Sequence, residues 1–108
     1  MSSIVVSSDY AAIRQAIIDR HQIVCIYKDH TRECCPHAIG HTNGIERVLV
    51  YQFGGTSSRG LPPGGEWRCM DIPDMLQVQI RPGPWFTGTG HSRPQTCVKQ
   101  VDIDITQV

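Results

Sequence analysis

The sequence predicts a mainly β fold with one N-terminal helix, built as a small, strongly bent sheet or barrel. One stretch near the start has apolar residues spaced three and four apart, which is typical of an amphipathic helix. Five or six short segments rich in β-branched and aromatic residues follow it, and these are typical of strands. The chain has 108 residues, which is the length of one domain, and its 10 glycines and 7 prolines indicate frequent turns.

The predicted helix covers residues 9–21. Ser8 or Asp9 can cap it, because either side chain can accept a hydrogen bond from a free amide of the first turn. Since the apolar stripe is one-sided, we expect the helix to lie across a sheet or the end of a barrel. The stripe consists of Tyr10, Ile13, Ala16 and Ile17.

Residues 23–27 and 32–39 are the first two predicted strands, with a polar turn at 28–31 between them. Pro36 lacks an amide hydrogen, so it should push the second strand to a sheet edge or into a bulge. Asn43-Gly44 tolerates the positive φ angles of a type I′ turn and therefore predicts a hairpin into the next strand.

The third predicted strand, residues 46–53, has Val48, Val50 and Gln52 on one face. The glycine-rich loop at 54–65 follows it. This loop lacks the Gly-Lys-Ser/Thr ending of a P-loop. Its backbone amides can still hold an anion, and a plain hairpin connection is the alternative.

Three further strands are predicted after this loop. Residues 67–72 form the fourth, which ends at a proline, and residues 76–81 form a half-buried fifth strand with clean alternation. Residues 101–106 form the last strand, with one face in water. Between the last two strands lie Trp85, His91 and Arg93, which either cap a barrel mouth or contact a partner.

Charge and composition exclude several classes of protein. Ten Lys and Arg balance ten Asp and Glu, which argues against binding nucleic acid through a bulk positive charge. No apolar run reaches membrane-spanning length, and residues 1–8 do not look like a secretory signal, so we expect a cytoplasmic protein without membrane contact. Five cysteines are an odd number, which favours reduced thiols in a bacterial-type cytoplasm over a disulfide framework.

Several segments are similar to one known family. The strand Ile23-Val24-Cys25-Ile26-Tyr27 follows the helix, and Arg32 and Pro36 come next at the family's spacing. Arg47-Val48-Leu49-Val50-Tyr51 and Trp67-Arg68-Cys69-Met70-Asp71-Ile72 stand where the family has its Trp-Tyr-Leu strand and its aromatic-Arg-Leu-Asp-Arg-Ile strand. Through these segments, residues 10–80 resemble the WYL domain. Only Leu49 remains of the name-giving tripeptide, and Asp71 replaces the family's second arginine.

The resemblance implies a small SH3/Sm-like β-barrel that acts as a sensor or regulator of transcription or phage defence. It also implies a polar face that binds nucleic acid or a nucleotide-like ligand. On this basis we expect an N-terminal tail at 1–8, a WYL-like barrel with its leading helix at 9–81, and a C-terminal extension at 82–108. We expect the last strand of this extension to pack on the same domain, and we expect no helix-turn-helix.

Five residues are candidates for binding a ligand. Arginines offer planar, bidentate donors to phosphate, and aromatic rings offer stacking faces to bases. Asp71 should lower the affinity for phosphate or reserve the site for a less anionic ligand. In the alternative interpretation the arginines reach solvent or pair with Glu33, Glu46 or Glu66, and the tyrosines complete the core. The candidates are Tyr27, Arg32, Arg47, Tyr51 and Arg68.

Cysteine and histidine chemistry has little support. Cys34 and Cys35 are adjacent on a strand and point to opposite faces, so they rarely reach one metal ion. We expect one of them to be a small buried hydrophobe and the other an edge thiol. No family signature surrounds any cysteine as a nucleophile. We therefore predict no catalytic residues, no metal and no cofactor.

The predicted function is a non-catalytic ligand-sensing or regulatory module. It binds a small anionic ligand or single-stranded nucleic acid on its Arg/Tyr face. The alternative is a structural or interaction protein that works as a homo-oligomer or within a protein complex, because small barrels often expose strand edges.

Overall fold

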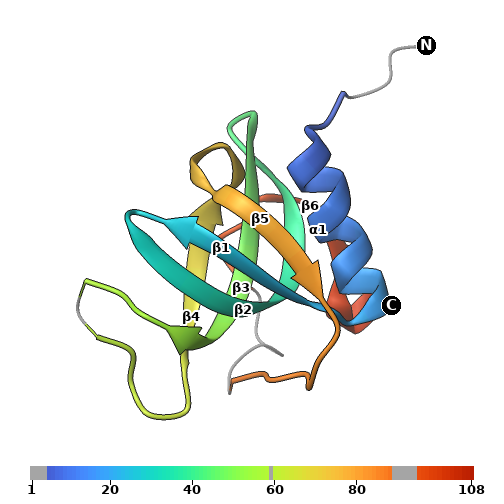
Figure 1. Ribbon diagram of the computed structural model, residues 1–108. Helices are drawn as coiled ribbons and strands as arrows, with labels where there is room; N and C mark the ends of the chain where they lie inside the picture. The colour runs from blue at the N-terminus through green and yellow to red at the C-terminus, as the bar shows by residue number, and fades with distance from the viewer. Residues whose placement is uncertain (1–4, 59, 89–94) are drawn as a thin grey trace.

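The computed structural model shows one α-helix packed against a six-stranded antiparallel sheet (Figure 1). It describes residues 5–58, 60–88 and 95–108, so His91 and Arg93 lie outside the described residues. The mainly β class with an N-terminal helix is confirmed. Among the described residues no pairing joins the outer strands β4 and β5, so the sheet is open.

Helix α1 covers Ser8–Asp19. Its cap is Ser7, one residue earlier than expected, and the Ser7 side chain accepts a hydrogen bond of 3.1 Å from the Tyr10 amide. The helix ends because Arg20 adopts the left-handed conformation at φ 56°. The predicted apolar stripe is confirmed, since Tyr10, Ile13, Ala16 and Ile17 are all buried.

The six strands pair in the order β4-β3-β2-β1-β5, and β6 pairs with β2 outside this path. Each predicted strand is present, with ends that differ by a few residues. Two short 3₁₀ turns, Ile72–Asp74 and Ile105–Gln107, follow β4 and β6. The strands are β1 Gln22–Tyr27, β2 His30–Thr42, β3 Ile45–Gly55, β4 Glu66–Asp71, β5 Leu76–Arg81 and β6 Gln100–Asp104.

Strand β2 is the centre of the sheet and is longer than the sequence predicts. It pairs with β3 along most of its length, with β1 as far as Cys34, and with β6 from Ala38 onward. Pro36 lies where β2 exchanges one partner for the other, beside a register shift. The predicted bulge is therefore confirmed, and the predicted edge position is wrong. A missing amide hydrogen is tolerated there because the pairing changes at that point.

Two tight turns connect the first three strands. Asn43 and Gly44 have φ angles of 52° and 80°, which confirms the predicted hairpin. The β1–β2 turn is shorter than expected and consists of Lys28 and Asp29, both with positive φ. These turns hold β1, β2 and β3 as consecutive antiparallel neighbours.

The core lies between α1 and the concave face of the sheet, with α1 covering one end (Figure 1). Strand β5 departs from the predicted half-buried pattern. Leu76 is 58 % exposed and Ile80 is 36 % exposed, because β5 is an edge strand that pairs with β1 alone among the described strands. The fully buried core side chains include Ile13, Ile17, Ile23, Ile39, Val48, Val50 and Met70.

A disulfide joins Cys69 on β4 to Cys97, just before β6. The expectation of five reduced thiols is therefore wrong at these two positions. The disulfide links the C-terminal segment to the outer strand β4, and the pairing of β6 with β2 links it to the centre of the sheet. In the part of the chain described, no helix is long and apolar enough to cross a membrane.

Candidate functional site

Strand register brings Arg32 and Arg68 to the same concave face of the sheet. Arg68 on β4 lies directly opposite Val50 on β3, so it shares the face of Val50 and Gln52. Cys34 on β2 lies opposite Gln52, and Arg32 is two residues before it. Strand β3 lies between the strands of the two arginines, and Gln52 stands on this intervening strand.

Arg32 is buried, with only 5 % of its surface exposed. Its Nε donates to the Tyr27 carbonyl at 3.1 Å, and its Nη1 donates to Gln52 Oε1 at 3.3 Å. The guanidinium carbon lies 5.5 Å from the centre of the Tyr27 ring, in a cation–π arrangement. Nη2 has no hydrogen-bond partner among the described residues and keeps contact with solvent.

No described carboxylate forms an ion pair with Arg32. All of its partners are neutral oxygens or an aromatic ring. A buried charge normally has a counter-charge, because removing it from water costs several kcal/mol. Arg32 is therefore a buried cation whose charge the described part of the chain leaves uncompensated.

Gln52 connects this arginine to the loop after β3. Its Nε2 donates to the carbonyls of Gly54 at 3.0 Å and Thr56 at 3.1 Å, while its Oε1 accepts from Arg32. One pattern in the sequence indicates this role, because Gln52 is a polar residue in phase with Val48 and Val50, which are buried. The side chain holds the start of the loop against Arg32.

Arg68 stands on the other side of Gln52 and is partly exposed. Its Nη2 lies 2.7 Å from Glu66 and donates to Ser57 Oγ at 3.1 Å. Its Nε is buried and has no hydrogen-bond partner among the described residues. This pairing with Glu66 agrees with the alternative interpretation, in which the arginines pair with nearby glutamates.

These side chains form a positive cluster at the end of the sheet away from α1, next to the β1–β2 turn and the β3–β4 loop (Figure 1). Two guanidinium groups stand against one carboxylate, that of Glu66. Ser57 contributes a hydroxyl from the glycine-rich loop. We call this group the Arg32 cluster, and it consists of Tyr27, Arg32, Gln52, Ser57 and Arg68.

Arg47 lies on the opposite face of the sheet from the Arg32 cluster. It faces Asp71 across β3 and β4, and its Nε donates to the Asp71 carboxylate at 2.7 Å. Its Nη1 also reaches the Cys97 carbonyl at 3.5 Å. The aspartate that replaces the family's second arginine thus pairs with Arg47, away from Arg32.

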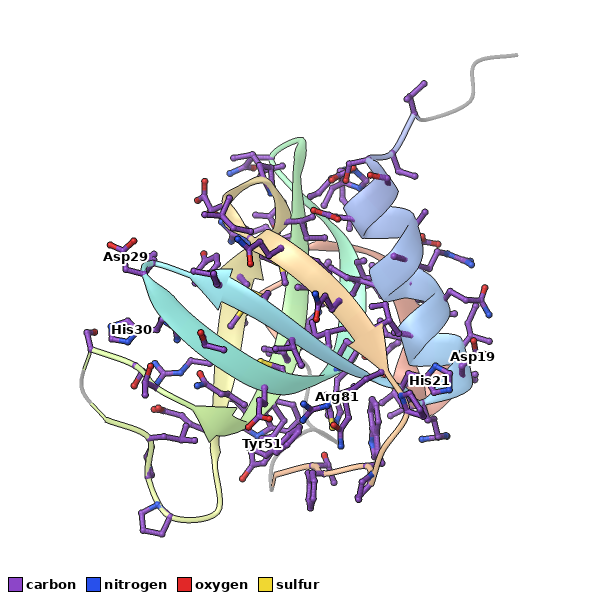
Figure 2. All side chains as sticks on the ribbon, viewed as in Figure 1. Asp19, His21, Asp29, His30, Tyr51 and Arg81 are labelled. Atoms are coloured by element: carbon purple, nitrogen blue, oxygen red, sulfur yellow. A yellow bond between two sulfur atoms is a disulfide. The ribbon has the colours of Figure 1, made fainter. Side chains whose placement is uncertain are left out.

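Tyr51 also lies outside the cluster. It shares the convex face with Trp67, and the two ring centres are 5.1 Å apart. Its hydroxyl donates to the Gly64 carbonyl at 2.5 Å. Figure 2 shows His30 at the end of the β1–β2 hairpin and Tyr51 well separated from it. Of the five candidate residues, the structure therefore brings together Tyr27, Arg32 and Arg68.

The segment after β5 covers this convex face. Trp85 lies 5.0 Å from the His37 ring, between ring centres, and Phe86 lies 4.6 Å from Phe53. The Phe86 amide donates to the sulfur of Cys35 at 3.3 Å. Trp85 thus packs on the sheet, and Cys35 is buried beneath this segment. Cys34 is buried as well, so the expectation of an edge thiol at one of the two cysteines is wrong.

The three free thiols are not activated for nucleophilic attack. Burial raises the pKa of Cys25 to about 11, although Arg32 lowers it. Burial also raises the pKa of Cys34, although Arg32 and Arg68 act in the opposite direction, and burial raises that of Cys35. These thiols stay protonated near neutral pH, and a thiolate is the form that attacks. No group of three His, Cys, Asp or Glu side chains in the described ranges could hold a metal ion.

Comparisons of the sequence with models of protein families and with curated proteins, and of the structure with solved structures, found no match.

Proposed function

We propose that this protein binds a small anionic ligand at the Arg32 cluster and acts as a non-catalytic sensing or regulatory module. The ligand carries a phosphate or carboxylate group. It approaches Arg32 through the solvent-facing Nη2 atom, and Arg68 and Ser57 supply donors from the other side. A bidentate contact with a guanidinium is the usual way in which proteins recognise such groups.

The uncompensated charge of Arg32 is the observation that carries this proposal. A buried guanidinium with only neutral partners destabilises the fold, and an anion would relieve that cost on binding. The buried Nε of Arg68, which has no hydrogen-bond partner among the described residues, also supports an anion site. Costly polar groups of this kind are concentrated at functional sites.

A small anion is a better candidate than single-stranded nucleic acid. Proteins that bind single strands expose aromatic rings on which bases stack. The Tyr27 ring is only 7 % exposed and already carries Arg32, and Tyr51 lies on the other face. The balanced net charge also provides little attraction for a polyanion.

The fold, in this proposal, is a divergent and open form of the SH3/Sm-like small barrel of WYL domains. The strong bend of the sheet and the leading helix support it (Figure 1). The cytoplasmic location remains a prediction. The Cys69–Cys97 disulfide weighs against it, because disulfides persist mainly in oxidising compartments.

Thermal unfolding at constant ionic strength tests the proposal, with inorganic phosphate, citrate, a nucleoside monophosphate and single-stranded DNA of about 15 nucleotides as probes. A small anion at a hundred times its Kd stabilises the protein by about 2.7 kcal/mol, or roughly 10 °C in Tm for a chain of this length. Arg32→Gln and Arg68→Gln should each abolish this saturable shift.

Arg81→Gln is the matched control, because it removes the same charge from an arginine that pairs with Glu33 outside the cluster. It should leave the shift intact. Two results would refute the proposal: no probe stabilises the wild type, or the Arg68→Gln protein, folded like the wild type, is stabilised just as much. Stabilisation by DNA alone would shift the assignment to nucleic acid.

One observation favours the alternative, a homo-oligomeric interaction protein. One side of edge strand β5 pairs with no described strand, and β5 exposes Leu76 and Ile80. Exposed apolar edges of this kind often pair with another chain. This alternative predicts a mass that rises with protein concentration in analytical ultracentrifugation and returns to that of a monomer in Leu76→Lys. A constant monomer mass up to millimolar protein would exclude it.

A further inference from the structure

A second concave site lies at the end of the sheet that α1 covers. It is a pocket of about 540 Å³ between the start of α1, the end of β2 and strand β6. This size is within the usual range for small-molecule sites. The pocket shares no residue with the Arg32 cluster, and it is lined by Val6, Tyr10, His41, Gln100, Val101 and Asp102.

Two stacked rings form one wall of the pocket. Tyr10 and His41 have ring centres 5.4 Å apart and planes inclined by 30°. The Tyr10 hydroxyl donates to Asp102 at 2.7 Å, which fixes the orientation of the ring. Val6 and Val101 add apolar surface. Because Tyr10 is only 2 % exposed, it acts as the support of the partly exposed His41 ring, and the His41 ring offers a planar aromatic ligand a fixed stacking surface beside apolar side chains.

Asp102 is the carboxylate of the pocket, and described residues donate hydrogen bonds to one of its two oxygens. Oδ2 accepts from both the Tyr10 hydroxyl and Arg14 Nε, at 2.7 and 2.9 Å. Oδ1 accepts no hydrogen bond from a described residue. Burial by itself would raise the pKa of Asp102, but the hydrogen bonds from Tyr10 and Arg14 outweigh it and keep the pKa below its usual value. The carboxylate is therefore charged at neutral pH.

The charges around the pocket favour a cation. Two carboxylates, those of Asp102 and Glu46, act on Tyr10, against the guanidinium of Arg14, which pairs with Asp102 at 2.9 Å. The His41 ring also acts on Asp102. Glu46 also accepts from the Ser7 amide at 2.8 Å, so an anion already occupies the positive end of α1. A second anion would meet both carboxylates, whereas an ammonium group would pair with the free oxygen of Asp102.

We propose that this pocket binds a small aromatic amine, with the ammonium group on Asp102 Oδ1 and the ring against His41, which Tyr10 supports from behind. The ring wall, the free carboxylate oxygen and the apolar side chains together carry this inference. The inference does not rest on the anion site. Its ligand has the opposite charge, and its residues come from the other end of the sheet.

The test is a titration of the ¹⁵N-labelled full chain with phenethylamine, followed by NMR. Benzyl alcohol supplies the ring without the charge, and phenylacetate supplies the opposite charge. We expect saturable shifts at the amides of Tyr10, His41 and residues 100–102. Phenethylamine should bind at least about tenfold more tightly than either comparison compound, as expected for a hydrogen bond to a charged group.

Asp102→Asn should weaken binding by at least about tenfold, while Asp74→Asn makes the same charge change at an exposed site outside the pocket and should have no effect. Val101→Arg places a cation on an exposed residue of the pocket wall and should also abolish binding without disturbing the fold. Equal binding of the three compounds would overturn the proposal. So would unchanged binding in Val101→Arg, or shifts scattered over the surface.

Discussion

Replacing both Cys69 and Cys97 by serine is expected to lower the free energy of unfolding by about 3–4 kcal/mol. The two cysteines are 28 residues apart, and the bridge removes the freedom of that loop from the unfolded chain. A loss of this size is a large fraction of the stability of a small domain. Urea unfolding followed by tryptophan fluorescence measures it in the oxidised protein and in the variant.

Reduction of the wild type provides the control for this prediction. Dithiothreitol should lower the stability of the wild type to that of the double variant, and it should leave the variant unchanged. The three remaining thiols are buried and already reduced, so they contribute no redox effect. The bridge contributes no stability if the oxidised protein and the variant unfold at the same urea concentration.

Most of the secondary structure could be predicted from the sequence, because the spacing of the apolar residues differs between strands and the helix. Val48, Val50 and Gln52 alternate with outward-facing residues, and all three are fully buried. The sequence left two alternatives open where the relation between distant segments decides, as at Pro36, for which it allowed either a sheet edge or a bulge. Pro36 is in the middle of the sheet, because β2 changes partner from β1 to β6 there.

The disulfide could not be predicted for the same reason. Cys69 and Cys97 have no local pattern that links them, and an odd number of cysteines permits many pairings. Their Cα atoms come within 5.6 Å only because the C-terminal segment returns across β3 and β4. The expectation of reduced thiols, which rests on the number of cysteines alone, is therefore wrong at Cys69 and Cys97.

The alternation of side chains between the two faces of β3 explains why two candidate site residues lie apart from the Arg32 cluster. Arg47 and Tyr51 are in phase with Leu49, whereas the concave face holds Val48 and Val50. Alternation alone thus places these two residues on the opposite face from the core. Arg32 is different, because its burial without a counter-charge depends on Gln52 from β3 and the Tyr27 carbonyl from β1.

The second large effect is expected at Gly40, where β2 pairs with β3 on one side and β6 on the other. A Cβ atom at this position would collide with the backbone carbonyl of Gln100, and it would lie 2.8 Å from Cγ1 of Val98. A backbone group cannot move aside without separating the strands. Gly40→Ala should therefore detach β6 and lower the free energy of unfolding by roughly 3 kcal/mol.

Gly54→Ala is the matched control, since Gly54 is also a strand glycine and its added Cβ would also meet an oxygen atom. That oxygen belongs to the side chain of Glu33, which can rotate away, so the control should lose little stability.

Hydrogen exchange should show faster exchange of the β6 amides in Gly40→Ala, while the β1–β2 amides stay protected. Because β6 lines the Asp102 pocket, the same variant should also stop binding phenethylamine and keep its response to small anions. If the two alanine variants are equally stable, the attachment of β6 to β2 does not depend on the close approach of the Gln100 backbone to Gly40.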